Sequence, residues 1–92
     1  MLEMIITGQY KKDCRRMSKR GKDMTKLNDV IQMLCNGETL PASYDDHRLQ
    51  GKSKGCRECH IEPDWLLEYK IDRNDLVLVA MRTGSHCDLR FC

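Results

Sequence analysis

The sequence has no long hydrophobic run. Its longest uncharged apolar stretch is Leu76–Met81, far shorter than the roughly 20 residues that a membrane-spanning helix needs. The segment 1–7 has no basic lead, and its apolar residues are too few for the apolar stretch of about 7–15 residues in a signal peptide. We therefore expect no secretory signal peptide. About one third of the residues are charged. These features argue against a membrane protein and predict a water-soluble, cytoplasmic one.

The sequence also has no internal repeat and no low-complexity segment. Its 92 residues, of which 40% are apolar, allow one small domain over residues 1–92 with a modest core. Six cysteines would suggest a disulfide framework in a secreted chain. Because no export signal is expected, free thiols in a reducing cytosol are the better prediction.

Positive charge is concentrated near the N-terminus. The net charge is only +2, but residues 11–26 hold eight basic and two acidic side chains. Such a local excess is typical of a surface that binds polyanions, although a solvated helix face can have the same composition. The basic residues expected to contact phosphates are Lys11, Lys12, Arg15, Arg16 and Lys19.

The first half of the chain predicts a strand and two helices. Leu2–Ile6 is rich in β-forming residues. In Gln9–Arg20 the apolar residues recur at helical spacing, and Gly21 ends the pattern. A second apolar stripe, Met24–Cys35, follows directly. The short connection predicts that the two helices form an antiparallel hairpin.

The second half predicts three antiparallel strands. A polar loop over Ser43–Ser53 precedes them, and the candidate strands are Gly55–Ile61, Trp65–Ile71 and Leu76–Arg82. Their connections are short, so neighbouring strands should run antiparallel. The expected fold is therefore α+β in the order β-α-α-β-β-β, with two N-terminal helices packed on a small, twisted, mostly antiparallel sheet.

Pairing across the two turns predicts which residues share a face of the sheet. Ile71 should lie opposite Leu76, Trp65 opposite Arg82, and His60 opposite Leu66. One face is then apolar and should cover the helices, with Trp65, Leu67, Tyr69, Ile71, Leu76, Leu78 and Ala80. The other face carries Glu58 and His60, and Asp64 lies in the turn beside them.

Histidine is scarce, with His47, His60 and His86 alone in the chain. His60 and Asp64 meet at one turn, and Arg82 and His86 should arrive at the same end of the sheet. A histidine beside a carboxylate suits general acid–base catalysis. Each histidine taken alone is better explained as a surface residue with ordinary hydrogen bonds, and it is the convergence at one end of the sheet that favours a site.

The segment Cys56–His60 also fits the C-x-x-C-H pattern of c-type haem attachment. That chemistry needs an export signal, a second axial ligand and a pocket for a large ring, whereas the motif lies in a predicted strand. A zinc site of Cys56, Cys59, His60 and either His86 or Cys87 is a further alternative. The chain has no second C-x-x-C pair, so we expect neither metal nor other cofactor.

Several long strings of the sequence resemble the YafQ branch of the RelE superfamily, whose members are mRNA interferase toxins of type II toxin–antitoxin systems. The most specific strings run from Arg57 to Trp65 and from Arg82 to His86. The resemblance covers nearly the whole chain. Further matching segments are Gly8–Asp13, Leu40-Pro41, Asp46–Gly51 and Lys54–Lys70.

The resemblance implies a RelE-like fold, metal-independent cleavage of mRNA in the ribosomal A site, and neutralisation by a cognate antitoxin. It carries the family's functional residues onto His47, His60, Asp64 and His86. An acidic residue two positions before the second histidine falls on Glu58, and the family's C-terminal aromatic falls on Phe91. Members tend to end in a Leu-Phe pair, whereas here Arg90 separates Leu89 from Phe91.

The predicted function is therefore that of a ribosome-dependent endoribonuclease toxin. We expect His86 to act as the acid and either His60, oriented by Asp64, or Asp64 itself to act as the base, with His47 in support. Arg82 would hold the scissile phosphate, and Phe91 would stack on a base.

The expected partners are mRNA on the ribosome, ribosomal RNA bound through the basic first helix, and the antitoxin, with no membrane. The alternative function is that of a non-catalytic module that binds RNA or the ribosome.

Overall fold

A five-stranded sheet forms the centre of the part of the chain that the computed structural model describes, residues 1–50 and 55–90. The strand order is β1-β5-β4-β3-β2; β1 runs parallel to β5, and the other neighbours are antiparallel. The elements along the chain are β1 (Glu3–Ile6), α1 (Gly8–Lys19), α2 (Met24–Cys35), η1 (Ala42–Tyr44), β2 (His47–Arg48), β3 (Arg57–Glu62), β4 (Trp65–Asp72), β5 (Val77–Gly84) and α3 (His86–Leu89).

The two long helices begin and end at the signals that the sequence carries. The Thr7 side chain accepts a hydrogen bond from the backbone N–H of Tyr10 and caps α1, and Asp23 caps α2 through the N–H of Thr25. Gly21 follows α1 with a φ of 85°, which glycine adopts without strain. The predicted α+β fold is confirmed, with both helices within a residue or two of their expected bounds.

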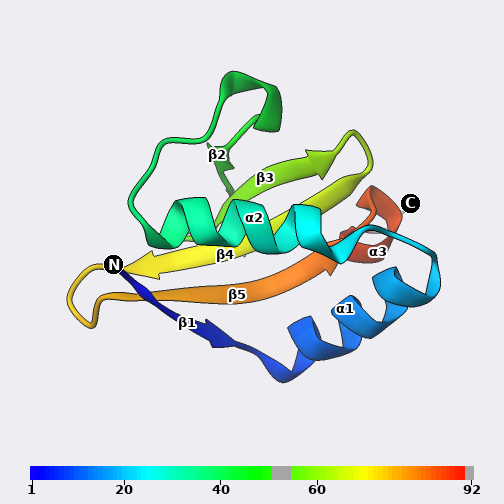
Figure 1. Cartoon of the computed structure of the whole chain (residues 1–92), viewed down its shortest axis with the longest axis horizontal. Coiled ribbons are helices and arrows are strands. Elements are labelled where there is room, and N and C mark those ends of the chain that lie inside the picture. The colour runs from blue at the N-terminus through cyan, green and yellow to red at the C-terminus, as the bar shows by residue number, and fades with distance from the viewer. Residues whose placement is uncertain (51–54, 91–92) are drawn as a thin grey trace.

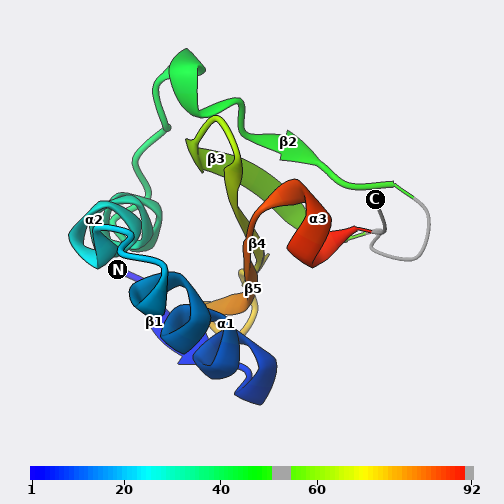
Figure 2. The same ribbon diagram turned by 90° about the vertical axis from the view of Figure 1, so that its right-hand side faces the viewer.

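The core lies between the helices and one face of the sheet. Tyr10 and Met17 of α1 and five residues of α2 are buried in the core. Figures 1 and 2 show α2 across the sheet, with α3 on its opposite side at the end of β5. The predicted apolar face is confirmed for Trp65, Leu67, Tyr69, Leu78 and Ala80, all of which are buried.

The predicted register of β4 and β5 is wrong. Ile71 lies opposite Leu78, and Glu68 lies opposite Arg82. The Asp72 carboxylate accepts hydrogen bonds from two backbone N–H groups in the turn, which lengthens the turn and places Leu76 in it with a φ of 56°. Leu76 is consequently 59% exposed instead of part of the core.

Three short elements fall where no helix or strand was predicted, and one of them is the 3₁₀ turn η1, Ala42–Tyr44. The strand β2 is His47–Arg48, in a region assigned to the polar loop over Ser43–Ser53; residues 51–53 of that loop lie outside the described residues. The single-turn helix α3 follows β5 directly. Elements of two to four residues are too short to show a periodic pattern.

Two further expectations concern the oxidation state of the cysteines and the presence of a membrane-spanning helix. Cys14, Cys35, Cys56 and Cys59 carry free thiols, as expected. Cys87 is disulfide-bonded, which contradicts the expectation for that residue. No helix within residues 1–50 and 55–90 combines the length and the apolar character needed to cross a membrane.

Leu78 and Leu76 offer a direct test of the observed register. Leu78→Ala should lower the free energy of unfolding by about 2–5 kcal/mol, because the Leu78 side chain is fully buried. Leu76→Ala should change it by less than about 0.5 kcal/mol. Urea unfolding followed by circular dichroism measures both; equal losses would contradict the register.

Candidate active site

Three histidines from three separate elements come together on the side of the sheet that α2 leaves open. His47 begins β2, His60 lies on β3 and His86 begins α3. The His60 ring lies between the other two, with centroid distances of 6.3 Å to His47 and 5.6 Å to His86. An open pocket of about 470 Å³ reaches His60 from the side of η1. The three histidines predicted from the sequence are therefore close enough to act on one bound group.

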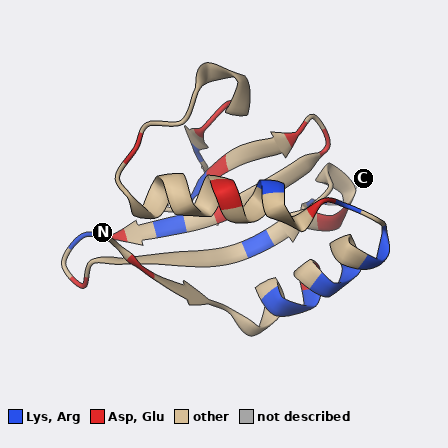
Figure 3. Ribbon diagram, in the orientation of Figure 1, with Lys and Arg blue, Asp and Glu red and all other residues tan. Residues whose placement is uncertain are grey.

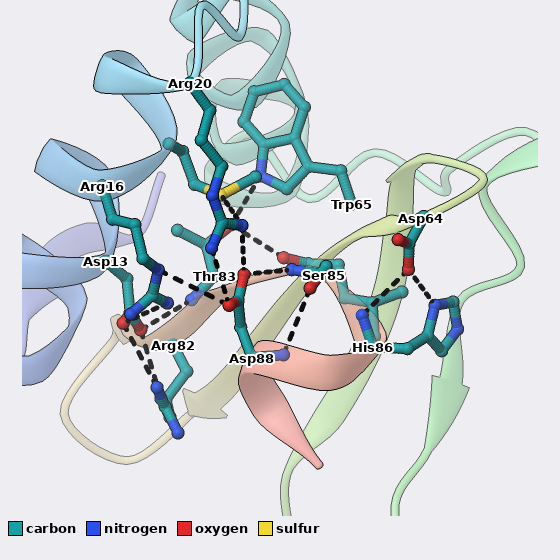
Figure 4. A network of polar contacts seen from close by, with 12 residues as sticks. Asp13, Arg16, Arg20, Asp64, Trp65, Arg82, Thr83, Ser85, His86 and Asp88 are labelled. Atoms are coloured by element: carbon teal, nitrogen blue, oxygen red, sulfur yellow. Dashed lines mark hydrogen bonds and ion pairs between the residues drawn. The ribbon is translucent and has the colours of Figure 1, made fainter. Parts of the chain in front are cut away.

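His86 is held by the carboxylate of Asp64, which lies in the turn between β3 and β4. Asp64 Oδ1 lies 2.5 Å from His86 Nδ1 and accepts a hydrogen bond of 2.9 Å from the His86 backbone N–H (Figure 4). These bonds, the backbone one first, lower the pKa of Asp64. An ionised carboxylate can only accept, so His86 Nδ1 carries a proton and Nε2 is turned away from Asp64.

His47 and His60 have less complete hydrogen bonding. His47 Nδ1 lies 2.7 Å from the backbone oxygen of Asp45, and its Nε2 lies 3.4 Å from Oε1 of Glu58. His60 Nδ1 is buried and has no hydrogen-bond partner among the described residues. Its nearest carboxylate oxygen is Oδ2 of Asp45, at 3.6 Å. Among the described residues, no protein group therefore fixes Nδ1 of His60 by a hydrogen bond.

A row of charged side chains crosses the sheet beside the histidines. His47 pairs with Glu58, Glu58 with Glu68, and Glu68 with Arg82 on successive strands. Arg90, which follows α3, donates Nη2 to Oε2 of Glu58 and places Nη1 3.8 Å from Oε2 of Glu68. Burial raises the pKa of Glu68, and Arg90 offsets part of that effect. Arg90 thus neutralises two adjacent carboxylates that would otherwise repel each other.

Arg82 is held by a buried carboxylate of α1. Asp13 accepts hydrogen bonds from Arg82 Nε and Nη2 at 3.1 and 3.2 Å, and also from Gln9, Arg16 and the Thr83 backbone (Figure 4). Burial alone would raise the pKa of Asp13, but the bonds from Arg82 and Gln9 outweigh it and the pKa is lowered. Asp13 is fully buried, so the direction of the Arg82 guanidinium is fixed from inside the protein.

Two contacts in the structure differ from those expected from the sequence. Asp64 binds His86 and not His60, although it follows β3 directly. Arg82 binds Asp13 instead of reaching the turn that holds Asp64. The register explains the second difference, because Arg82 lies two residues before the end of β5.

Several residues of the site were missed by the sequence analysis. Glu68 could have been found, because strand alternation puts it on the same face as Glu58 and His60. Others depend on contacts between distant segments and leave no local signal: Asp13, Asp45, Asp88 and Arg90. The predicted stacking residue Phe91 lies outside the described residues.

The predicted basic surface lies along α1 (Figure 3). Lys11, Lys12, Arg15 and Lys19 are exposed there. Arg16 differs, since its guanidinium binds Asp13 at 2.9 Å and lies 3.7 Å from Asp88. The first four side chains are therefore available for phosphates, whereas the Arg16 guanidinium is paired with Asp13.

The cysteines of the C-x-x-C-H motif do not converge with its histidine. Cys59 is fully buried in the core, and burial raises the pKa of its thiol to about 12. His60 points to the opposite face, because successive side chains of a strand alternate. Within residues 1–50 and 55–90, no three His, Cys, Asp or Glu side chains are grouped so as to hold a metal ion.

Comparison with known proteins places the chain among bacterial toxins. Residues 2–91 match the family described as the bacterial toxin of type II toxin–antitoxin systems, YafQ. The chain belongs to this YafQ family. The mRNA interferase toxin YafQ of Escherichia coli (strain K12) is 49% identical over 88 residues, which cover 95% of this chain and 94% of that protein.

Two solved structures extend the comparison. The crystal structure of the Escherichia coli DinJ–YafQ complex contains a chain with 43% sequence identity and a TM-score of 0.87, covering 97% of this chain and 98% of that one. A metal-bound toxin from Helicobacter pylori has 37% identity and a TM-score of 0.92, covering 98% of this chain and 100% of its own. Both confirm the small α+β fold.

Proposed function

We propose that this toxin is an endoribonuclease that cleaves mRNA in the ribosomal A site by metal-independent acid–base chemistry. The observation that carries the proposal is the pairing of His86 with Asp64, beside the ring of His60, whose Nδ1 has no hydrogen-bond partner among the described residues. The mRNA interferase activity of the Escherichia coli relative supports it. The reaction needs a base for the RNA 2′-hydroxyl and an acid for the departing 5′ oxygen.

His86 is the acid in this mechanism. Its Nδ1–H is held by Asp64, so Nε2 is the nitrogen that delivers a proton to the 5′ oxygen as the P–O5′ bond breaks. The lowered pKa of Asp64 keeps that carboxylate ionised at neutral pH. An ionised Asp64 accepts from both the backbone N–H and the Nδ1–H of His86, and so fixes the direction of the ring.

His60 is the base. The 2′ oxygen attacks the adjacent phosphorus while His60 accepts the 2′ proton, which leaves a 2′,3′-cyclic phosphate and a 5′-hydroxyl. Asp64 is the poorer candidate, because a carboxylate with a lowered pKa accepts a proton less readily near neutral pH. The centroids of the His60 and His86 rings lie 5.6 Å apart, close enough for both rings to reach oxygens of one phosphate bound over them.

The charge that develops on the phosphoryl oxygens needs a cation. Arg82 is proposed for that task, with its guanidinium fixed by Asp13. His47 supports the site from β2, where it also contacts Glu58. Phe91 remains the proposed stacking residue.

The exposed basic residues of α1 are proposed to bind ribosomal RNA through its phosphates. Lys12→Ala/Lys19→Ala should weaken ribosome binding roughly 10-fold at about 100 mM salt and flatten its salt dependence, because two phosphate contacts are lost. Lys70→Ala/Arg73→Ala removes the same charge from exposed positions on β4 and the following turn and should change little. Ribosome co-sedimentation across a salt series measures both; equal effects would rule out a dedicated surface on α1.

A cognate antitoxin is the proposed protein partner, by analogy with the complex of the Escherichia coli toxin with DinJ. The site of action would be the cytoplasm, where ribosomes translate mRNA. No membrane contact is part of this proposal.

The proposed function is tested with purified toxin, a defined mRNA and ribosomes. Cleavage should require ribosomes that carry the mRNA. It should also persist when EDTA is added briefly to ribosomes that were assembled beforehand in free Mg²⁺. The EDTA arm matters because the Helicobacter pylori relative is described as metal-bound. Binding of ribosomes without cleavage would favour the non-catalytic alternative.

A further inference from the structure

The helix that carries His86 cannot hold itself in place. The helix α3 has four residues, His86–Leu89, and a single helical turn in water is unstable without tertiary contacts. His86 is its first residue, so the position of the His86 ring depends on how this turn is fixed to the rest of the protein. Asp64 holds the ring from one side.

Asp88 fixes the same turn from the other side. Its carboxylate accepts a hydrogen bond of 2.8 Å from the backbone N–H of Ser85, and Ser85 Oγ accepts one of 3.1 Å from the N–H of Asp88. These reciprocal bonds form a capping box. The Asp88 oxygens also accept hydrogen bonds from both Nη groups of Arg20, at 2.5 and 2.9 Å. Figure 4 shows this contact between α1 and α3.

The close approach of α3 to α1 depends on the absence of a side chain at Gly84. A Cβ at Gly84 would come within 2.8 Å of the Asp88 Cβ and 2.9 Å of its Oδ2, and 3.2 Å from Nη2 of Arg16. No φ constraint requires glycine there, since the positive-φ glycines are elsewhere. Glycine is needed at position 84 because any side chain there would collide with Asp88. The bonds from Arg20, followed by those from Ser85, hold the pKa of Asp88 well below its usual range.

We propose that Asp88 is a positioning residue for RNA cleavage: by binding Arg20, it fixes α3 so that His86 Nε2 faces the reacting 5′ oxygen. This inference rests on the proposed function of His86. Arg20 belongs to the helix whose exposed lysines are proposed to bind ribosomal RNA, but its guanidinium is committed to Asp88. Arg20 therefore acts on the rate of proton delivery and not on the affinity for the ribosome.

Arg20→Met is the primary test, because it removes the contact to Asp88 and leaves the capping box of Ser85 intact. A misplacement of about 1 Å can cost on the order of 100-fold in rate, so kcat should fall roughly 10- to 100-fold with KM nearly unchanged. Arg20→Lys, which keeps one charged donor, should recover part of kcat. Lys70→Met is the matched control at an exposed position on β4 and should leave both kcat and KM unchanged.

A double-mutant cycle separates positioning from a general structural effect. Combined with His86→Ala, Arg20→Met should cause no further loss of rate, because it acts through His86. The nuclear magnetic resonance signal of the His86 Nδ1 proton, shifted downfield by its bond to Asp64, should weaken in Arg20→Met and persist in Lys70→Met.

Two outcomes overturn the inference. If wild-type toxin cleaves mRNA and Arg20→Met retains its kcat while KM rises, Arg20 is an RNA contact and Asp88 does not position His86. If Arg20→Met lowers the rate equally in the His86→Ala background, the effect is structural. Failure of wild-type toxin itself to cleave would instead refute the proposed function.

Discussion

His86→Ala should lower the rate of mRNA cleavage on ribosomes by about 100- to 10 000-fold, the usual loss when a general acid is removed. The departing 5′ oxygen would then have to leave without a proton from the protein. The His86 side chain is 50% exposed, so the fold and the affinity for ribosomes should be preserved. The measurement is a single-turnover cleavage assay at saturating toxin, with circular dichroism to verify folding.

Asn74→Ala, in the turn at the far end of β4, is a suitable control and should cleave at the wild-type rate. Added imidazole should restore part of the activity of His86→Ala, because a free ring can deliver the missing proton. Cleavage by His86→Ala within about threefold of wild type would show that His86 is not the acid. The assignment of Asp64 as its orienting group would fail with it.

Asp13→Ala should lower the free energy of unfolding by about 3 kcal/mol, the largest loss expected from any polar residue described. The Asp13 carboxylate is fully buried and accepts hydrogen bonds from side chains of α1 and β5 and from the Thr83 backbone. Its removal leaves those donors without their acceptor, including two guanidinium groups. Urea unfolding measures the loss, and the exposed Asp29→Ala on α2 should change stability by less than about 0.5 kcal/mol.

The stability that Asp13 contributes should depend on pH in a defined direction. Its pKa is lowered from the ordinary value of 3.8, so the folded state binds its proton less readily than the unfolded state does. The contribution is therefore full above pH 3.8 and is lost as the pH falls through the lower, folded-state pKa. A difference between wild type and Asp13→Ala that stays constant from pH 6 to pH 2 would contradict the buried, ionised carboxylate.

The sequence was sufficient for the elements with a strong periodic pattern. The helical spacing of apolar residues in α1 and α2, together with the glycine that follows each, predicted both helices almost to the residue. Alternation along β3 and β4 predicted that His60 and Glu58 share a face away from the core. These features depend on neighbours in the sequence, which is why periodicity was enough to find them.

The features that failed depend on long-range contacts. The register of β5 was wrong because an Asp72 side chain reorganised the turn, and residue types alone gave no reason to place Leu76 there. The pairing of Asp64 with His86 needs α3 to fold back over the sheet, and α3 is held by Asp88 and Arg20. Sequence alone could therefore find the three histidines but not their individual partners.

Arg90 illustrates the same point. In the sequence it is an interruption of the expected Leu-Phe ending. In the structure its guanidinium lies between the carboxylates of Glu58 and Glu68, on two adjacent strands. The extra arginine and the acidic residue at position 68 compensate each other in charge, although they are separated by 22 positions.

Mapping of RNA ends tests the central claim most directly. Ribosomes translating a defined mRNA are treated with wild-type toxin or with His86→Ala, and the new termini are identified by position and chemistry. Wild-type toxin should produce new 5′-hydroxyl ends and 2′,3′-cyclic phosphates inside the translated frame, and His86→Ala should produce almost none. New 5′-phosphate ends, or the same ends at the same rate with His86→Ala, would contradict the account.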